Sequence, residues 1–183
     1  MILQMLNFLR EVEGYEKDYY IPTKDGRILG NSGITIGIGI DLGQQSEQRL
    51  KALGVEDSVI HKLKPAFGVR GEKAIYVKKD LLPLSPEEVL YLSLAIIGDE
   101  LNVLKVYLED AYCKLIPEAI IVAMSLFHQF GYKLFKYKTY KQLLQQDYKG
   151  LLANLRDFGC NYPTRRNKEA DLLENGLRKR GLL

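Results

Sequence analysis

The stretch of sequence that decides the fold is Ser32-Gly33-Ile34-Thr35-Ile36-Gly37-Ile38-Gly39-Ile40-Asp41-Leu42-Gly43. Large and small residues alternate between positions 34 and 40, and this period of two predicts one β-strand. The isoleucines would share its buried face. Thr35 is then the one functional side chain on the opposite face, where bare glycine backbone permits a ligand or another chain to approach closely.

Asp41 follows this threonine by six residues. The two side chains would share a face if the strand continued regularly. A second interpretation is a glycine-rich hairpin strand packed against a helix, with Asp41 as a turn or capping residue. The glycines do not form a phosphate-binding loop, because the third glycine of a dinucleotide fingerprint is missing and no Gly-Lys-Ser/Thr sequence follows.

A short amphipathic helix is predicted for residues 2–12, where apolar residues recur at helical spacing. Gly14 ends it, so Glu13 lies in the last turn, near the negative end of the helix dipole. That position disfavours ionisation, and partial burial would act in the same direction. Both effects suit a general acid. The alternative is that Glu13 is a solvated residue at a helix end. An acid, a hydroxyl and a second acid over one cleft can split a glycosidic bond.

The Glu13-Gly14 pair, followed by the Ser-Gly-Ile-Thr to Asp-Leu-Gly block, resembles the phage-type lysozymes, and most closely their pesticin-like muramidase domains. In that subgroup an acid, a threonine and an aspartate six residues later form the active site. The matching residues here are Glu13, Thr35 and Asp41. Two features leave this assignment open: Glu11 is a rival acid, and better-known phage lysozymes carry their aspartate before the threonine.

The resemblance continues downstream over most of the chain. Residues 117–131 resemble the long central helix whose Phe-Gln-x-Gly end borders the cleft, which implies that Gln129 binds substrate. The Pro163-Thr164-Arg165 sequence resembles the family's Pro-x-Arg segment, which makes Arg165 the partner of Glu13. Tyr15, beside the proposed acid, is expected either to stack on a sugar ring or to serve as half-buried packing.

The fold class expected from these patterns is α+β and mostly helical. It is lysozyme-like, with a small N-terminal β-sheet lobe and a helical lobe joined by a long helix. With 183 residues, we expect a single lysozyme-like domain. Its β-containing lobe would span about residues 13–80, and its helical lobe about 84–183 together with the N-terminal helix. The strongest helix start is Ser85-Pro86-Glu87-Glu88, a capping box with proline in the first turn.

Other helices are predicted for residues 46–53, 55–63, 74–78, 117–131, 137–146, 148–157 and 168–180. The helix beginning at Ser85 is expected to run past Gly98 toward Tyr112. The helix over residues 55–63 is expected to stop before Pro65. Turns are expected at Asp25-Gly26 and at residues 30–31.

Composition excludes several functional classes. The net charge of +3 is too small for a dedicated nucleic-acid binder. No apolar run is long enough for a membrane span. No cluster of cysteine and histidine indicates a metal, and no cofactor is expected. Cys113 and Cys160 form either a disulfide or two buried thiols. We expect a monomer whose partner is the glycan of peptidoglycan, together with an immunity protein if the chain is a bacteriocin or a secreted effector.

The resemblance implies hydrolysis of the β-1,4 bond between N-acetylmuramic acid and N-acetylglucosamine. The alternatives are a lytic transglycosylase and a wall-binding or spike-associated module that has lost its activity. The N-terminus lacks the cationic start of a signal peptide. We therefore expect synthesis in the cytoplasm and action in the bacterial periplasm or cell wall, after release or delivery.

Overall fold

The computed structural model describes residues 1–159 and 162–183, so Cys160 and its pairing lie outside the described residues. The chain divides into two compact units. Unit 1 comprises Met1–Phe8 and Gly98–Leu183, and unit 2 comprises Leu9–Ile97. Two helices contribute to both units, namely α1 (Ile2–Glu13) and α5 (Pro86–Leu108). The first is the predicted N-terminal helix.

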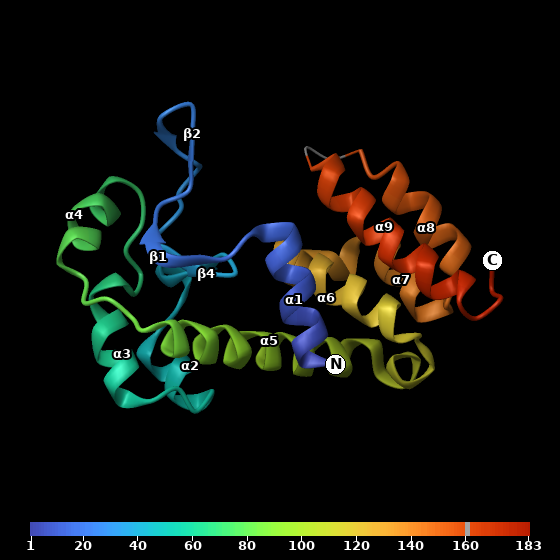
Figure 1. Cartoon of the computed structure of the whole chain (residues 1–183), viewed down its shortest axis with the longest axis horizontal. Helices are drawn as coiled ribbons and strands as arrows, with labels where there is room; N and C mark the ends of the chain where they lie inside the picture. The colour runs from blue at the N-terminus through green and yellow to red at the C-terminus, as the bar shows by residue number, and fades with distance from the viewer. Residues whose placement is uncertain (160–161) are drawn as a thin grey trace. The chain divides into compact units, whose positions relative to one another are not determined.

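Unit 2 contains the β structure of the described residues (Figure 1). Strands β1 (Glu16–Tyr20), β4 (Thr35–Gly37) and β5 (Ile40–Asp41) form an antiparallel sheet in the order β1-β4-β5. Strands β2 (Thr23–Lys24) and β3 (Arg27–Ile28) form a separate hairpin. Its two turn residues, Asp25 and Gly26, have φ angles of 52° and 75°, which is the primed turn that an Asp-Gly pair favours.

The prediction of one strand over residues 34–40 was wrong. This stretch is a tight hairpin in which Ile36 pairs with Ile40 across the two strands. Gly37 and Gly39 form its turn with φ angles of 65° and 89°, a backbone conformation that glycine adopts without steric cost. All four isoleucines are buried, as expected, but the alternating glycines reverse the chain instead of lining a bare face.

Helices complete unit 2 in the order η1 (Leu42–Gln44), α2 (Glu47–Ala52), α3 (Asp57–Leu63), η2 (Lys64–Ala66) and α4 (Glu72–Asp80). Helix α3 ends at Leu63, before Pro65, as predicted. The chain continues as η2, where a proline in the first turn lacks only an amide that would be unpaired there. The capping box at α5 is confirmed. The Ser85 amide donates to Glu88 Oε2 at 2.7 Å, and the Glu88 amide donates to Ser85 Oγ at 3.2 Å.

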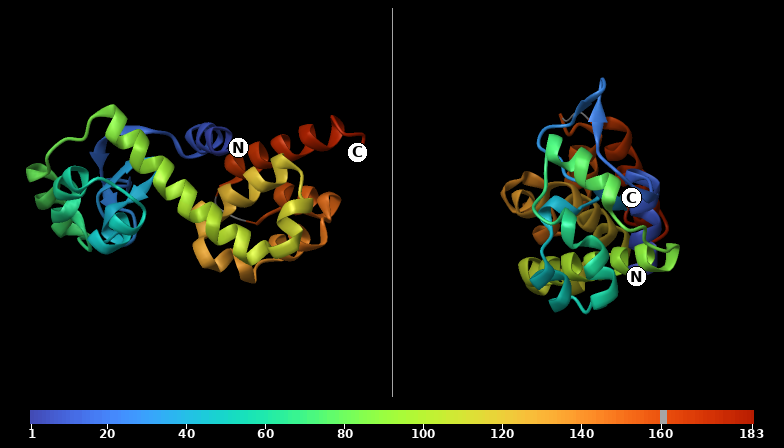
Figure 2. Two further views of the ribbon diagram at one scale, coloured as in Figure 1. Left: turned by 90° about the horizontal axis from the view of Figure 1, so that it is seen from below. Right: turned by 90° about the vertical axis from the view of Figure 1, so that its left-hand side faces the viewer.

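Unit 1 is helical in the residues described. Its elements after α5 are η3 (Glu109–Lys114), α6 (Pro117–Phe130), η4 (Gly131–Lys136), α7 (Lys138–Gln145), α8 (Tyr148–Arg156) and α9 (Pro163–Arg178). Helix α6 is buried without interruption from Ala119 to Phe127, and α9 packs against both α6 and α8 (Figure 2). Such an all-round apolar helix forms the centre of a core.

Two helix boundaries differ from the prediction by more than two residues. Helix α9 begins at Pro163, not at Lys168, with the proline in its first turn, a position where its fixed φ angle is favourable. Helix α5 ends at Leu108, and the chain continues as η3. Among the described residues, no helix combines the length and the apolar character that a membrane crossing requires.

Candidate functional site

Thr35 and Asp41 are direct partners across the β4–β5 hairpin. Side chains of directly opposed residues lie on the same face of the sheet, with Cβ atoms about 4.5–5.5 Å apart. The hairpin therefore brings together the two residues that the sequence predicted on one face, although by pairing between strands and not along one strand. Thr35 is only 3% exposed, whereas Asp41 is partly exposed.

Asp41 is held by two donors. The Gly43 amide donates to its Oδ1 at 2.8 Å, and the Gln44 side-chain amide donates to its Oδ2 at 3.0 Å. The residue thus caps η1, which confirms the capping interpretation of its position. The capping role is compatible with a catalytic role, because the same hydrogen bonds fix the orientation of the carboxylate. The Thr35 hydroxyl donates to the Gly33 carbonyl at 3.4 Å.

Two glycines make room for this carboxylate. A Cβ atom on Gly33 would lie 2.4 Å from Asp41 Oδ1, and one on Gly43 would lie 3.0 Å from the same oxygen and 2.7 Å from the Val69 carbonyl. Arg70 holds the loop that follows Asp41, since its Nε donates to the Gly43 carbonyl at 3.1 Å. Sequence analysis missed Arg70, because nothing in its local pattern indicates a contact with a loop so distant in the chain.

Gly37 is not the open backbone that the sequence pattern predicted. A Cβ atom there would lie 2.8 Å from Ser93 Oγ and 3.4 Å from a methyl group of Val89, both on α5. The glycine is therefore needed for close packing of the hairpin turn against the helix. The candidate residue of β4, Thr35, lies at the beginning of the strand and not at its glycine-rich end.

Glu13 is the last residue of α1 and is exposed. Its exposure agrees with the alternative interpretation, a solvated residue at a helix end, and its position in the last turn of the helix is as predicted. Gly14 follows with a φ angle of 83°, which turns the chain toward β1. There Glu16 pairs with Gly37 of β4. Glu13, Thr35 and Asp41 all belong to unit 2; their convergence on one substrate remains a prediction.

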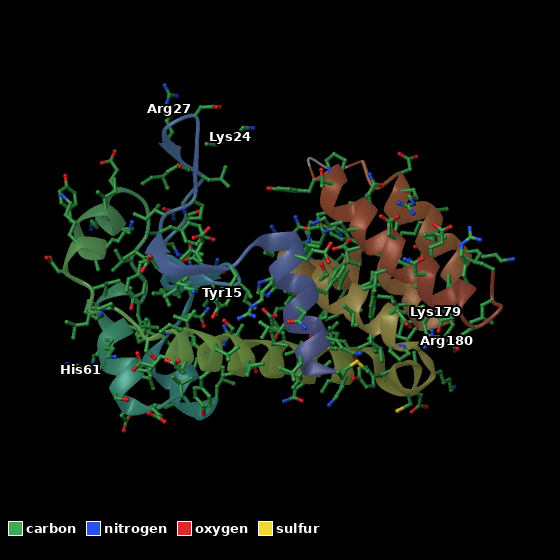
Figure 3. The ribbon with its side chains drawn as sticks, viewed as in Figure 1. Tyr15, Lys24, Arg27, His61, Lys179 and Arg180 are labelled. Atoms are coloured by element: carbon green, nitrogen blue, oxygen red, sulfur yellow. The ribbon has the colours of Figure 1, made fainter. Side chains whose placement is uncertain are left out.

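Tyr15 lies between α1 and β1 and is partly buried (Figure 3). The guanidinium of Arg10 lies over its ring, 4.0 Å from the centroid. This cation–π contact covers one face of the ring, so a sugar would have to stack on the other. The predicted sugar contact of Tyr15 is thus confined to one side of the ring.

Arg165 is buried in the first turn of α9 and binds residues of unit 1. Its Nη2 donates to the Ser125 carbonyl at 2.6 Å, and its Nε donates to Glu169 Oε1 at 3.2 Å. Burial lowers the pKa of Arg165 to about 10. Burial also raises the pKa of Glu169, against the opposing effect of the Arg165 and Arg166 guanidiniums. The predicted pairing of Arg165 with Glu13 joins residues of different units and stays a prediction.

Gln129 accepts a hydrogen bond from Arg166 through its Oε1. Arg166 in turn lies near two stacked aromatic rings, with its guanidinium 5.5 Å from the centroid of Phe130 and 5.1 Å from that of Phe158. The Gln129 carbonyl is therefore engaged within the protein, which leaves its amide hydrogens for the substrate contact that the sequence predicts. The neighbouring His128 pairs with Glu100 at 2.8 Å.

Within the described ranges, no group of three histidine, cysteine, aspartate or glutamate side chains has a geometry suited to a metal ion. Cys113 is a free and exposed cysteine, so the expectation of a buried thiol at this position was wrong. The candidate residues of unit 2 are two carboxylates and a hydroxyl, Glu13, Asp41 and Thr35, which are groups suited to acid–base chemistry.

One of two comparisons with known proteins assigns the chain to a family. A search of curated protein sequences found no match. A family model named Pesticin, described as a bacterial toxin homologue of phage lysozyme, C-terminal part, matches residues 5–149. The match includes Glu13, Thr35, Asp41 and Gln129 and ends before Arg165. Because it covers most of the chain and agrees with the mostly helical α+β fold, the chain belongs to the pesticin family of lysozyme-like toxin domains.

Proposed function

We propose that the protein is a peptidoglycan hydrolase that cleaves the β-1,4 bond between N-acetylmuramic acid and N-acetylglucosamine. The observation that carries this proposal is the Thr35–Asp41 pair, fixed across a two-strand hairpin and seated over Gly33. A rigid hydroxyl–carboxylate pair of this kind can position a water molecule for attack on a sugar ring. Membership of the pesticin family supports the wall polymer as substrate.

In the proposed reaction, Glu13 acts as the general acid and protonates the leaving glycosidic oxygen. Thr35 and Asp41 orient and activate the attacking water, and Asp41 also stabilises the positive charge that develops on the sugar ring. The side chains of Tyr15 and Gln129 bind the glycan, and Arg165 orients the acid. Attack by water from the face opposite the leaving group predicts inversion at the anomeric carbon.

The first test is Glu13→Gln. The residue is exposed at a helix end, so the amide should leave the fold intact while it removes the transferable proton. We expect clearing of purified peptidoglycan to stop, with an unchanged circular dichroism spectrum and melting temperature. Glu11→Gln is the matched control, because it makes the same change on the same helix two residues earlier. Full activity of the Glu13 variant, or loss in the Glu11 variant alone, would end the assignment of Glu13.

Mass spectrometry of the released fragments separates hydrolysis from its nearest rival. Reducing muramic ends with the mass of added water support a hydrolase, and anhydro-muramic ends identify a lytic transglycosylase. Binding to peptidoglycan without any released fragment would indicate an inactive wall-binding module. A hydrolase of this type acts at the cell wall of a target or host cell, and a producer with the same wall chemistry would need an inhibitor protein.

A further inference from the structure

A groove separates the β2–β3 hairpin from α4 within unit 2. It has a volume of about 390 Å³, within the usual range for sites that hold small ligands and short peptides. The residues that line it are Ile21, Thr23, Gly26 and Ile28 from the hairpin region and Ile75, Lys78 and Lys79 from α4. Neither the resemblance nor the proposed reaction assigns a role to this groove.

The α4 wall of the groove is formed by one helix face. Ile75, Lys78 and Lys79 occupy positions i, i+3 and i+4, which lie next to one another on a helix surface. The isoleucine is 43% exposed, and both lysines are exposed at the end of the helix. This face therefore presents an apolar side chain flanked by two ammonium groups.

The hairpin wall adds apolar surface but no charge. Thr23 and Ile28 are direct cross-strand partners and line the groove together. The next pair, Lys24 and Arg27, therefore points to the opposite face of the hairpin, at the end of which both are seen in Figure 3. No acidic side chain lines the groove, and Lys78 and Lys79 form no ion pair with any described residue. The groove thus combines an apolar floor with two unneutralised cations at one side.

This chemistry matches a short peptide that carries carboxylates and methyl groups. We propose that the groove binds the peptide stem of peptidoglycan, the chain of alternating L- and D-amino acids attached to each muramic acid. Its free carboxylates would pair with Lys78 and Lys79, and its alanyl methyl groups would lie on Ile28 and Ile75. The inference rests on the proposed function, because the stem reaches the protein as part of the glycan substrate.

The position of the groove supports this occupant. Tyr20 is the cross-strand partner of Thr35, and the next residue, Ile21, already lines the groove. The groove therefore begins one residue after the strand position opposite Thr35, in the same unit as the Thr35–Asp41 pair. The groove would then select glycan that carries stems over glycan from which they have been removed.

The test compares two double variants of the full chain. Lys78→Gln with Lys79→Gln removes both groove cations, and Lys24→Gln with Arg27→Gln removes two exposed cations from the opposite face of the same hairpin. Each protein is titrated calorimetrically with the free tetrapeptide L-Ala-γ-D-Glu-diaminopimelate-D-Ala. Cleavage rates are then measured on intact peptidoglycan and on glycan stripped of stems by an amidase.

We expect the groove variant to bind the tetrapeptide about five- to tenfold more weakly, with the hairpin variant unchanged, since partly exposed ion pairs contribute modestly. On intact peptidoglycan the groove variant should show a raised KM with little change in kcat, and on stripped glycan it should match the wild type. An equal loss in both variants would overturn the proposal in favour of general attraction to an anionic wall.

Two further outcomes would also overturn it. One is no tetrapeptide binding to the wild type, and the other is equally tight binding of an acidic peptide of L-residues, which would indicate a protein partner. Because calorimetry requires no turnover, failure of stem binding remains distinct from failure of the proposed function, which would appear as no cleavage of either glycan.

Discussion

Asp41 has two roles at the residue scale, because the carboxylate that is proposed to activate water also accepts hydrogen bonds from Gly43 and Gln44. Asp41→Asn separates them. The amide oxygen still accepts from the Gly43 amide, so the melting temperature should change little. Loss of the charge and of the basic oxygen should slow glycan cleavage by about 10²- to 10⁴-fold. Initial rates on purified peptidoglycan and a thermal melt measure the two effects separately.

Thr35 provides the control for that experiment. Thr35→Ser keeps the hydroxyl and should retain most of the activity, whereas Thr35→Val removes it at nearly constant volume. If the Asp41→Asn variant and the Thr35→Val variant were both fully active, the proposed role of the pair would be contradicted.

Gly33 has a structural requirement that stability measurements can test. In Gly33→Ala the new methyl group would lie 2.4 Å from Asp41 Oδ1 and 2.8 Å from the Val69 carbonyl, so the carboxylate must move. We expect a loss of about 1–3 kcal/mol in the free energy of unfolding, typical of overpacking, and a fall in the cleavage rate at temperatures where the variant is folded. Urea unfolding and peptidoglycan turnover are the measurements.

Gly98→Ala is the matched control. Gly98 lies inside α5, and a Cβ atom there meets nothing within 4 Å. Alanine should therefore stabilise the protein by about 0.5–1 kcal/mol through its higher helix propensity. If Gly33→Ala and Gly98→Ala changed the free energy of unfolding equally, crowding around Asp41 would not explain the effect of Gly33→Ala.

At the residue scale, the sequence predicted which candidate residues lie together better than it predicted what surrounds each of them. The spacing of Thr35 and Asp41 was sufficient to predict that they share a face, and the structure pairs them. The exposure of Glu13 agrees with the alternative interpretation of a solvated residue at a helix end. The Arg70 contact to Gly43 was not predictable, because it depends on which distant segments pack nearby, and a single sequence contains no local signal for that.

Elements with their own end signals were predicted well. Ser85 and Glu88 form the reciprocal hydrogen bonds of a capping box, and the Asp25-Gly26 turn has the expected positive φ angles. Residues 34–40 were predicted as one strand, and the turn inside this stretch was missed. Glycine at every second position satisfies the alternation of a strand as well as the backbone needs of a tight turn. The α9 start was misplaced although Pro163 marks it.

The capping box at α5 gives an element-scale prediction with a pH dependence. The hydrogen bond from Lys62, followed by that from the Ser85 amide, holds the pKa of Glu88 below its ordinary value of 4.5. A carboxyl whose pKa is lower in the folded protein adds stability above its unfolded pKa, and this contribution is lost as the pH falls through the folded value. Glu88→Gln should therefore destabilise the protein at pH 7 and become nearly neutral well below pH 4.5.

Ser85→Ala tests the other half of the box. It removes the acceptor for the Glu88 amide and should cost about 1 kcal/mol, the usual value for an N-cap, with a much weaker dependence on pH. Urea titrations at pH 7 and pH 3 compare the two variants. Equal losses for Glu88→Gln at both pH values would show that its charge does not contribute.

At the scale of the whole molecule, two helices are divided between compact units. Residues 1–8 of α1 belong to unit 1, and residues 9–13 belong to unit 2. Helical periodicity predicted α1 as one element, but it could not show that neighbouring turns serve different cores. The division depends on which segments surround each turn after folding.

Substitution of Leu6 and of Leu9 by alanine tests this division of α1 between the two units. Both are on α1 and almost fully buried, at 2% and 1% exposure, and they fall in unit 1 and unit 2 respectively. Leu→Ala in a core costs about 2–5 kcal/mol, so the two variants should lose similar stability. Hydrogen exchange followed by mass spectrometry should distinguish where that stability is lost, because exchange reports local opening.

Leu6→Ala should accelerate exchange chiefly in the helices of unit 1, most clearly in α6 and α9. Leu9→Ala should accelerate it chiefly in β1, β4 and β5, around Thr35 and Asp41, and should therefore reduce glycan cleavage more strongly at equal loss of stability. If both variants accelerated exchange throughout the chain to the same degree, the units would unfold as one cooperative body. The site in unit 2 would then depend on the entire molecule for its stability.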